Sequence, residues 1–301
     1  MDALKLNFSP DSLFLLNICL AIIMFGIALD IRIEDFRLII RQPRTAILGL
    51  ISQFLLLPLL TFLLILWHKP MPSIALGMML VAACPGGNIS NFLSHLAGAN
   101  SALSVSLTAV ATLLSLVLTP LNFELYANLY EPTRSLLQSI EIPVASVIKT
   151  ILIIIAVPLA LGILIQYRFP RLAAKVAPVL KVLSIFIFLA FIAVAFFNNY
   201  DLFINYVDKV LLLVLLHNGL AYLTGYSIGR LGGLGERECR TLTIETGIQN
   251  SGLGLVLIFA FFEGLGGMAF VTGWWGIWHI ISGLSLAFLW NRRTLPQESF
   301  T

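Results

Sequence analysis

Charged residues are scarce in this chain: they make up 11% of its 301 residues, whereas hydrophobic residues make up 59%. Ordinary soluble domains carry roughly 25% charged and 45–50% apolar residues, so a soluble globular protein is excluded. The three cysteines, Cys19, Cys84 and Cys239, show no paired spacing, so neither a disulfide framework nor a zinc site is indicated. Basic patches interleaved with aromatic residues are also missing, which argues against a nucleic-acid partner.

Long apolar runs dominate the sequence instead. Most of them are close to the roughly 20 residues that a helix needs to cross the hydrocarbon of a bilayer. The sequence therefore predicts an all-α polytopic membrane protein with about nine transmembrane helices. The expected spans are Ser12 to Leu29, Thr45 to Leu66, Ser73 to Leu96, Ala102 to Leu121, Ile142 to Gln166, Val182 to Phe197, Val210 to Ile228, Thr241 to Phe262 and Met268 to Trp290.

The basic residues indicate how these spans are oriented. Arg32, Arg37, Arg41 and Arg44 follow the first span instead of preceding it, which is the opposite polarity from a signal peptide. Cytoplasmic loops are enriched in Lys and Arg, and most of the basic residues of this chain fall on one side of the expected spans. We therefore expect an uncleaved multi-pass protein of the cell membrane, either a bacterial inner membrane or a plasma membrane. Its N-terminus should lie outside and its C-terminus in the cytoplasm.

The longest polar stretch divides the chain into two parts. We expect residues 1–121 to form a first repeat of four spans and residues 142–290 a second repeat of five spans. Residues 122–141 are expected to be an extracellular linker, and residues 291–301 a cytoplasmic tail.

The last four spans repeat the polar features of the first four in the same order. Gln53 lies in the second span, and the corresponding later span carries His217 and Asn218. Because the unmatched span Ile142 to Gln166 intervenes, the two repeats should be inverted relative to each other. For His217 and His279 we expect hydrogen bonds between helices more than contact with a substrate.

Two polar clusters interrupt apolar spans at matching places in the two halves. The first runs from Cys84 to Asn91 (CPGGNISN), and the second runs from Glu245 to Gly252 (ETGIQNSG). Hydrocarbon offers polar groups no water, so such clusters persist only where they face protein or a wet cavity. Broken segments at corresponding places in two halves are typical of a carrier with a binding site near the middle of the membrane.

Glu245 lies well inside a span, where a carboxylate is costly unless it has a cation, a proton or a hydrogen-bonded partner. Oxygen-bearing residues surround it, and hard cations prefer oxygen ligands, whereas a transition metal would need clustered His and Cys. Gly86, Gly87 and Gly247 allow the helices to unwind, which frees carbonyls for a cation and directs helix N-termini at an anion. The sequence thus predicts a cation and an anionic substrate bound side by side. The oxygen-bearing candidates are Gln53, Ser90, Asn91, Ser104, Thr108, Thr246 and Gln249.

Three other interpretations stay open at this point. In a proton-coupled carrier of organic anions, Glu245 would exchange a proton, although a proton would not need so many neutral oxygens. In an intramembrane enzyme, Glu245 and His279 would act as acid and base, although no H-E-x-x-H motif or nucleophile triad supports this. A structural or receptor-like membrane protein would not need two mirrored, broken polar helices.

Several short motifs resemble the bile acid:sodium symporter family, over a region from about Asp11 to Trp290. They are QFLLLPL at 53–59, CPGG at 84–87 followed by Ser90-Asn91, ALSV at 102–105, TPL at 119–121 and ETGIQN at 245–250. The resemblance implies a core domain, in which two discontinuous helices cross at the polar clusters, and a panel domain. It also implies that the first helix of repeat one is missing, as in the nine-span animal members of the family.

The resemblance further implies two bound sodium ions and no organic cofactor. One sodium site would use Ser90, Asn91, Ser104, Thr108 and Glu245. The other would use Gln53, Glu245 and Gln249, with the backbone carbonyls of Thr246 and Ile248. The substrate cavity would be lined by Asn88, Asn250 and His279.

We therefore expect a sodium-coupled secondary transporter, not an enzyme, that imports an organic anion by alternating access. Its partners are sodium, the lipid bilayer and an anion such as a bile acid or a smaller carboxylate; no oligomeric state is indicated. Relatives commonly carry Thr and a small residue where this chain has Asn88-Ile89, so bile acid itself is not singled out. Sodium at Glu245 would order the crossing helices before the panel moves.

Overall fold

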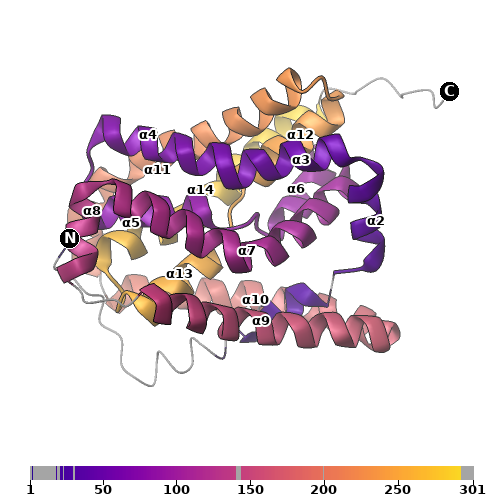
Figure 1. Cartoon of the computed structure of the whole chain (residues 1–301), viewed down its shortest axis with the longest axis horizontal. Coiled ribbons are helices and arrows are strands. Elements are labelled where there is room, and N and C mark those ends of the chain that lie inside the picture. Colours follow the sequence, from indigo (N-terminus) through magenta and orange to yellow (C-terminus); the bar gives the residue numbers. More distant parts are fainter. Residues whose placement is uncertain are drawn as a thin grey trace.

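The computed structural model describes residues 2, 18, 21–22, 24–29, 31–139, 144–198 and 200–292 of the chain. All the elements within these ranges are helices, and the chain shows an isolated antiparallel bridge between Gly86 and Gln249 (Figure 1). The all-α fold is therefore confirmed for the part of the chain that the structure describes. Half of the expected span Ser12 to Leu29 lies outside these residues, as do Cys19 and most of the expected tail.

Among the described residues, three continuous helical stretches are long and apolar enough to cross a membrane by length and composition. They are Pro43–His68, Ser101–Leu129 and Val210–Leu231. Large apolar side chains such as Val117 and Leu212 are exposed on these stretches, as expected for helices that face lipid. The fold is that of a multi-pass membrane protein, while the count of nine spans and the sidedness of the termini stay predictions.

The helices follow one another with short connections. The first group is α2 (Ile33–Arg41), α3 (Pro43–Ile51), the π-helical turn η1 (Ser52–Leu56), α4 (Leu57–His68), α5 (Pro72–Ala83), α6 (Ile89–Leu96), α7 (Ser101–Leu129) and α8 (Glu131–Ser139). The second group is α9 (Val144–Arg168), α10 (Pro170–Asn198), α11 (Tyr200–Leu231), α12 (Glu236–Gly247), α13 (Ser251–Phe261) and α14 (Gly266–Asn291).

Helix α7 is longer than the sequence suggests, because it continues past Leu121 to Leu129 and α8 follows almost at once. The added turns are packed: Tyr126 and Ala127 are buried in the main apolar core, and the Tyr126 ring lies 5.3 Å from that of Phe62 on α4. Most of the polar stretch 122–141 is therefore helical, since it carries a buried face.

The π-helical turn η1 has a local cause in Pro58. A proline has no N–H, so the carbonyl of Phe54, four residues earlier, has no helical partner. Asn122 of α7 supplies one, because its Nδ2 donates to the Phe54 oxygen at 3.0 Å. The backbone widens over Ser52–Leu56 and closes through a hydrogen bond from the Leu57 N–H to the Ser52 oxygen. Such π turns are frequent at functional sites.

Two helices are broken near their middles, and the two breaks pair with each other. The chain leaves α5 at Ala83 and resumes as α6 at Ile89, and it leaves α12 at Gly247 and resumes as α13 at Ser251. The Gly87 N–H donates to the Ile248 oxygen at 2.8 Å, and the Asn250 N–H donates to the Pro85 oxygen at 2.9 Å. Backbone groups released by one break are thus satisfied by the other, which fixes the crossing.

Helices α9 and α10 lie side by side along one edge of the molecule (Figure 1). Residues 24–29 pack against both: Leu29 contacts Ala173 and Ala177 in one apolar cluster, and Ala28 contacts Leu159 in another. Gly162 permits this approach, since a Cβ there would lie 2.4 Å from the Ala28 Cβ. These segments form a separate layer beside the crossed helices.

Candidate cation site at the helix crossing

The carboxylate of Glu245, near the end of α12, is buried at the crossing, with 6% of the residue exposed. It accepts hydrogen bonds from three hydroxyls. Ser90 Oγ of α6 lies 2.6 Å from Oε1, and Thr108 Oγ1 of α7 lies 2.9 Å from Oε2. Ser104 Oγ, one turn before Thr108, also donates to Oε1. The carboxylate therefore joins α6, α7 and α12 at one point.

Arg240, the other buried charged residue of α12, has an oppositely charged partner within the described part of the chain, unlike Glu245. Its guanidinium pairs with Glu236 at 3.2 Å and donates to the carbonyl oxygens of Ala97 at 2.9 Å and Trp290 at 3.3 Å. None of the ion pairs found among the described residues includes Glu245. Glu245 thus has hydrogen-bond donors but no counter-charge within this part of the chain, and such a charge is costly inside a membrane.

Oxygen atoms outnumber the available protons around Glu245. The Oδ1 of Asn91 lies 2.9 Å from Ser104 Oγ and 3.1 Å from Thr108 Oγ1. The Thr108 hydroxyl also lies 3.0 Å from the Ser104 carbonyl oxygen, so three acceptors face one hydroxyl proton. One proton satisfies one acceptor. The remaining lone pairs are of the kind that coordinate a hard cation.

A second set of oxygens lies where η1 meets the second break. Gln53 Nε2 donates to Gln249 Oε1 at 2.8 Å and to the Cys84 carbonyl oxygen at 2.9 Å. Gln249 Nε2 in turn donates to the Thr246 carbonyl oxygen at 2.7 Å. The structure therefore brings Gln53, Thr246 and Gln249 together, with Ile248 in the same break.

Gly86 connects the two sets of oxygens. A Cβ on this glycine would lie 2.9 Å from Glu245 Oε2, 3.3 Å from the Glu245 carbonyl oxygen and 3.8 Å from the Ile248 carbonyl oxygen. Oxygens from both sets thus surround one point that a side chain would fill. The residues present fit a small, hard cation in oxygen coordination.

Two of the predicted substrate residues lie at the N-termini of half-helices. Asn88 directly precedes α6, and Asn250 caps α13 by accepting the Leu253 N–H at 3.0 Å through Oδ1. The positive end of the helix dipole lies at such termini, which suits an anion. His279 of α14 is buried, and its Nδ1 has no hydrogen-bond partner among the described residues. No hydrogen bond found in the described part of the chain joins it to either asparagine.

Two consecutive residues of α11 bond to neighbouring helices, and the second of them contacts the crossing. His217 Nε2 lies 2.6 Å from Thr61 Oγ1 of α4, which confirms the expected bond between helices. Asn218 Nδ2 donates to the Gly247 carbonyl oxygen at 2.8 Å, and its Oδ1 accepts from Ser282 of α14 at 2.7 Å. Asn218 therefore caps the end of α12 as Gln53 caps the Cys84 carbonyl at the end of α5.

Two hydroxyls that contact the breaks were not among the predicted site residues. Thr119 Oγ1 donates to the Ala83 carbonyl oxygen at 2.6 Å, and Ser52 Oγ lies 2.7 Å from Thr246 Oγ1. Thr119 belongs to a family motif, but nothing local in the sequence pairs it with Ala83. The available signal for Ser52 is that it makes, with Gln53, a pair of consecutive polar residues in an apolar span.

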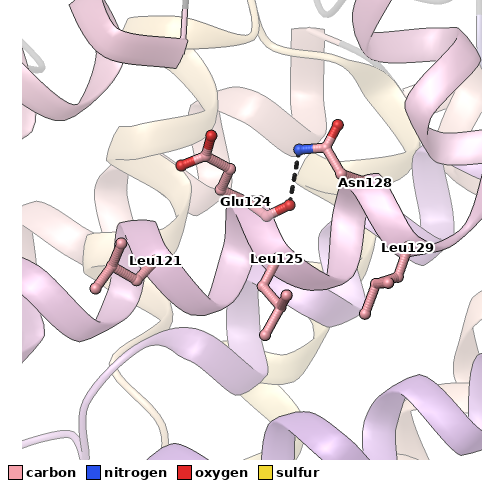
Figure 2. A pocket seen from close by; sticks show the side chains of 5 residues that line it. All are labelled: Leu121, Glu124, Leu125, Asn128 and Leu129. Carbon is pink, nitrogen blue, oxygen red and sulfur yellow. Dashed lines mark hydrogen bonds between the residues drawn. The ribbon is translucent and has the colours of Figure 1, made fainter.

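A hollow of about 380 Å³ on α7 is separate from this site (Figure 2). Its lining residues are Leu121, Glu124, Leu125, Asn128 and Leu129. Asn128 Nδ2 donates to the Glu124 carbonyl oxygen at 2.8 Å, within the same helix (Figure 2). The hollow is a feature of the outer, largely apolar face of α7.

Together these features define a polytopic helical membrane protein whose two broken helices cross at a buried, oxygen-lined carboxylate. The family model described as the sodium bile acid symporter family matches residues 17–206, and the chain belongs to this family. Its members are transporters, so the protein is a transporter and not an enzyme. The family predicted from the motifs is thereby confirmed.

Similar proteins come from bacteria, plants and animals. The chain is 32% identical over 299 residues to an uncharacterized sodium-dependent transporter, YocS, of Bacillus subtilis (strain 168), covering 98% of this chain and 90% of that one. It is 27% identical over 282 residues to a probable chloroplastic sodium/metabolite cotransporter, BASS2, of Oryza sativa subsp. japonica, covering 94% of this chain and 65% of that one. It is 31% identical over 240 residues to the ileal sodium/bile acid cotransporter of Homo sapiens, covering 79% and 67% respectively.

Proposed function

We propose that this protein is a sodium-coupled symporter that imports an organic anion across the cell membrane by alternating access. The observation that carries the proposal is the buried carboxylate of Glu245, which has three hydroxyl donors but no counter-charge within the described residues. A bound cation supplies that charge. The names of the relatives support sodium as this cation, since they include a sodium-dependent transporter and a sodium/bile acid cotransporter.

Two sodium ions bind at the crossing in this proposal. The first is held by the Glu245 carboxylate with Ser90, Asn91, Ser104 and Thr108, whose oxygens already converge. The second is held by Gln53 and Gln249, by the carbonyls of Thr246 and Ile248, and by Glu245. Oxygens of Glu245 and Ile248 lie close to the point that a Cβ on Gly86 would occupy, which supports a carboxylate shared by both ions.

The substrate is an organic anion such as a bile acid or a smaller carboxylate. Asn88 and Asn250 bind it beside the N-termini of α6 and α13, where the positive ends of the helix dipoles favour negative charge. His279 lines the same cavity from α14. Sodium therefore neutralises Glu245 close to where the anion binds, which couples the two binding events.

Transport requires the site to open to each side of the membrane in turn. In this proposal the crossed helices move as one body, since their breaks are joined by backbone hydrogen bonds. The layer made by residues 24–29, α9 and α10 is the panel against which they move. The N-terminus lies outside the cell and the C-terminus inside.

The test uses detergent-purified protein and sodium chloride titrated against choline chloride at constant ionic strength. We expect sodium to raise the thermal stability of the wild type, by about 2.7 kcal/mol at a hundredfold excess over the dissociation constant. The Glu245→Gln variant should lose this response, because the amide carries no charge. The matched control is Glu124→Gln on the outer face of α7, which should respond as the wild type does.

The result also separates sodium coupling from proton coupling. If sodium does not change the stability of the wild type, but an organic anion does so in a pH-dependent manner, the coupling ion at Glu245 is a proton and not sodium. An unaltered sodium response in Glu245→Gln would refute the proposed site.

A further inference from the structure

Ser52 and Thr246 form a contact that the proposed sodium ligands do not explain. Their hydroxyl oxygens lie 2.7 Å apart, and both residues are almost completely buried. Thr243, on the same helix α12, donates instead to a carbonyl of its own helix, that of Cys239 at 2.7 Å. Such bonding within a helix is the ordinary choice for threonine. Thr246 is thus held from outside its helix.

The contact closes a ring of hydrogen bonds. Gln53, the neighbour of Ser52, donates to Gln249 Oε1 at 2.8 Å, and Gln249 Nε2 donates to the Thr246 carbonyl oxygen at 2.7 Å. The ring therefore runs from Ser52 to Thr246, to Gln249, to Gln53 and back along one peptide. It contains two oxygens of the second proposed sodium site, Gln249 Oε1 and the Thr246 carbonyl.

The π-helical turn makes this ring possible. In an α-helix, consecutive side chains point about 100° apart, which directs neighbours at different partners. The wider turn of η1, closed from the Leu57 N–H to the Ser52 oxygen, lets Ser52 and Gln53 both contact the segment 246–249. The wider turn next to Pro58 is thereby used at the site.

We infer that Ser52 is a positioning residue for the second sodium site. Its hydroxyl holds Thr246 in the orientation in which the Thr246 carbonyl faces the ion. A cation at that carbonyl displaces the Gln249 N–H that now donates to it, so the ring opens at this bond while Ser52 keeps Thr246 in place. This inference rests on the proposed function, because it concerns a site proposed there.

The test compares Ser52→Ala with Ser106→Ala by the sodium concentration that gives half of the maximal thermal stabilisation. Ser106 is equally buried, but its hydroxyl donates to the Ala102 carbonyl oxygen of its own helix at 2.9 Å. We expect Ser52→Ala to raise the half-saturating sodium concentration about fivefold, the effect of one net hydrogen bond. The sodium response of Ser106→Ala should stay close to that of the wild type.

Further variants separate positioning from simple packing. Ser52→Thr keeps a hydroxyl and should restore half-saturation to within about twofold of the wild type. Thr246→Val removes the partner hydroxyl, so it should match Ser52→Ala, and the double variant should lose little more. In Ser52→Ala, the preference for sodium over lithium should also fall, because a loosely held carbonyl discriminates less between ion sizes.

The outcomes distinguish the inference from the proposed function. If sodium stabilises the wild type but the half-saturating sodium concentration is unchanged in Ser52→Ala and Thr246→Val, the inference is overturned. The proposed function then still stands. A wild type that shows no sodium response overturns both. If Ser52→Ala does not fold, the half-saturating concentration of Thr246→Val decides by itself.

Discussion

The break between α5 and α6 contains Cys84, Pro85, Gly86 and Gly87, whereas the break between α12 and α13 begins just after Gly247, close to Glu245, and contains Gln249. The first break contributes backbone groups and, at Gly86, the absence of a side chain. The second contributes a charge and an amide. The hydroxyls that meet the charge come from outside the breaks, on α6 and α7.

This difference shows that the site is divided between the two halves of the chain by chemical role. Both halves bring neutral oxygens, but the first half brings the space at Gly86 and the second half brings the carboxylate. Two identical halves would place two carboxylates or none at the crossing, and two carboxylates so close would repel each other. An asymmetric pair of breaks gives a single negative charge that one or two sodium ions can balance.

The largest effect should come from filling the space that the first break leaves. In Gly86→Ala the new Cβ would lie 2.9 Å from Glu245 Oε2, which is the movable end of a side chain, so the carboxylate shifts. Overpacking costs about 1–3 kcal/mol. We expect this cost to appear mainly in sodium binding, as a rise of about 10- to 100-fold in the half-saturating sodium concentration measured by thermal shift.

The neighbouring glycine provides the control for this prediction. In Gly87→Ala the nearest atom is the Gln249 carbonyl oxygen, at 3.0 Å, and it belongs to backbone. We expect the apparent free energy of unfolding in choline to fall by about 1–3 kcal/mol, with a smaller shift in sodium affinity than in Gly86→Ala. Equal sodium shifts in the two variants would contradict the division of roles.

An intermediate effect should distinguish the two amides that cap the breaks. Gln53→Leu and Asn218→Leu each leave a buried carbonyl without its donor, that of Cys84 or that of Gly247. We expect each variant to lose about 1–3 kcal/mol of unfolding free energy in choline. Only Gln53→Leu should also raise the half-saturating sodium concentration, by about tenfold, because only Gln53 belongs to the proposed second site. A similar sodium shift in Asn218→Leu would mean that sodium binding depends on capping the broken helices and not on Gln53 as a ligand.

The smallest effect concerns the origin of the π-helical turn. Pro58→Ala restores an N–H that can bond the Phe54 carbonyl, which Asn122 now serves at 3.0 Å. Asn122→Leu should therefore cost less in the Pro58→Ala background than in the wild type. We expect a coupling of about 0.5–1.5 kcal/mol in a double-mutant cycle of unfolding free energies. Additive effects would show that Pro58 does not leave the Phe54 carbonyl dependent on Asn122.

The sequence was sufficient to predict an all-α membrane fold, the family and the convergence of Glu245 with its hydroxyl partners. The hydroxyl partners came from the resemblance to the family, because hydroxyls inside apolar spans usually bond carbonyls of their own helix, as Ser106 does. Ser52 escaped prediction because its partner Thr246 is 194 residues away, and a single serine is common in membrane helices. The helical character of 122–139 was also missed, because Tyr126 and Ala127 are buried by contacts that no local pattern shows.

The hydrogen bonds of Glu245 have a consequence for how the protein is made. They span 137 to 155 residues, so Ser90, Ser104 and Thr108 are synthesised long before the carboxylate that they serve. Only neutral groups at the crossing enter the bilayer early, where unpaired hydroxyls cost far less than an unpaired charge. The charge arrives late, when its partners are already in the membrane. The order of the two halves along the chain thus spares the nascent protein an isolated carboxylate in lipid.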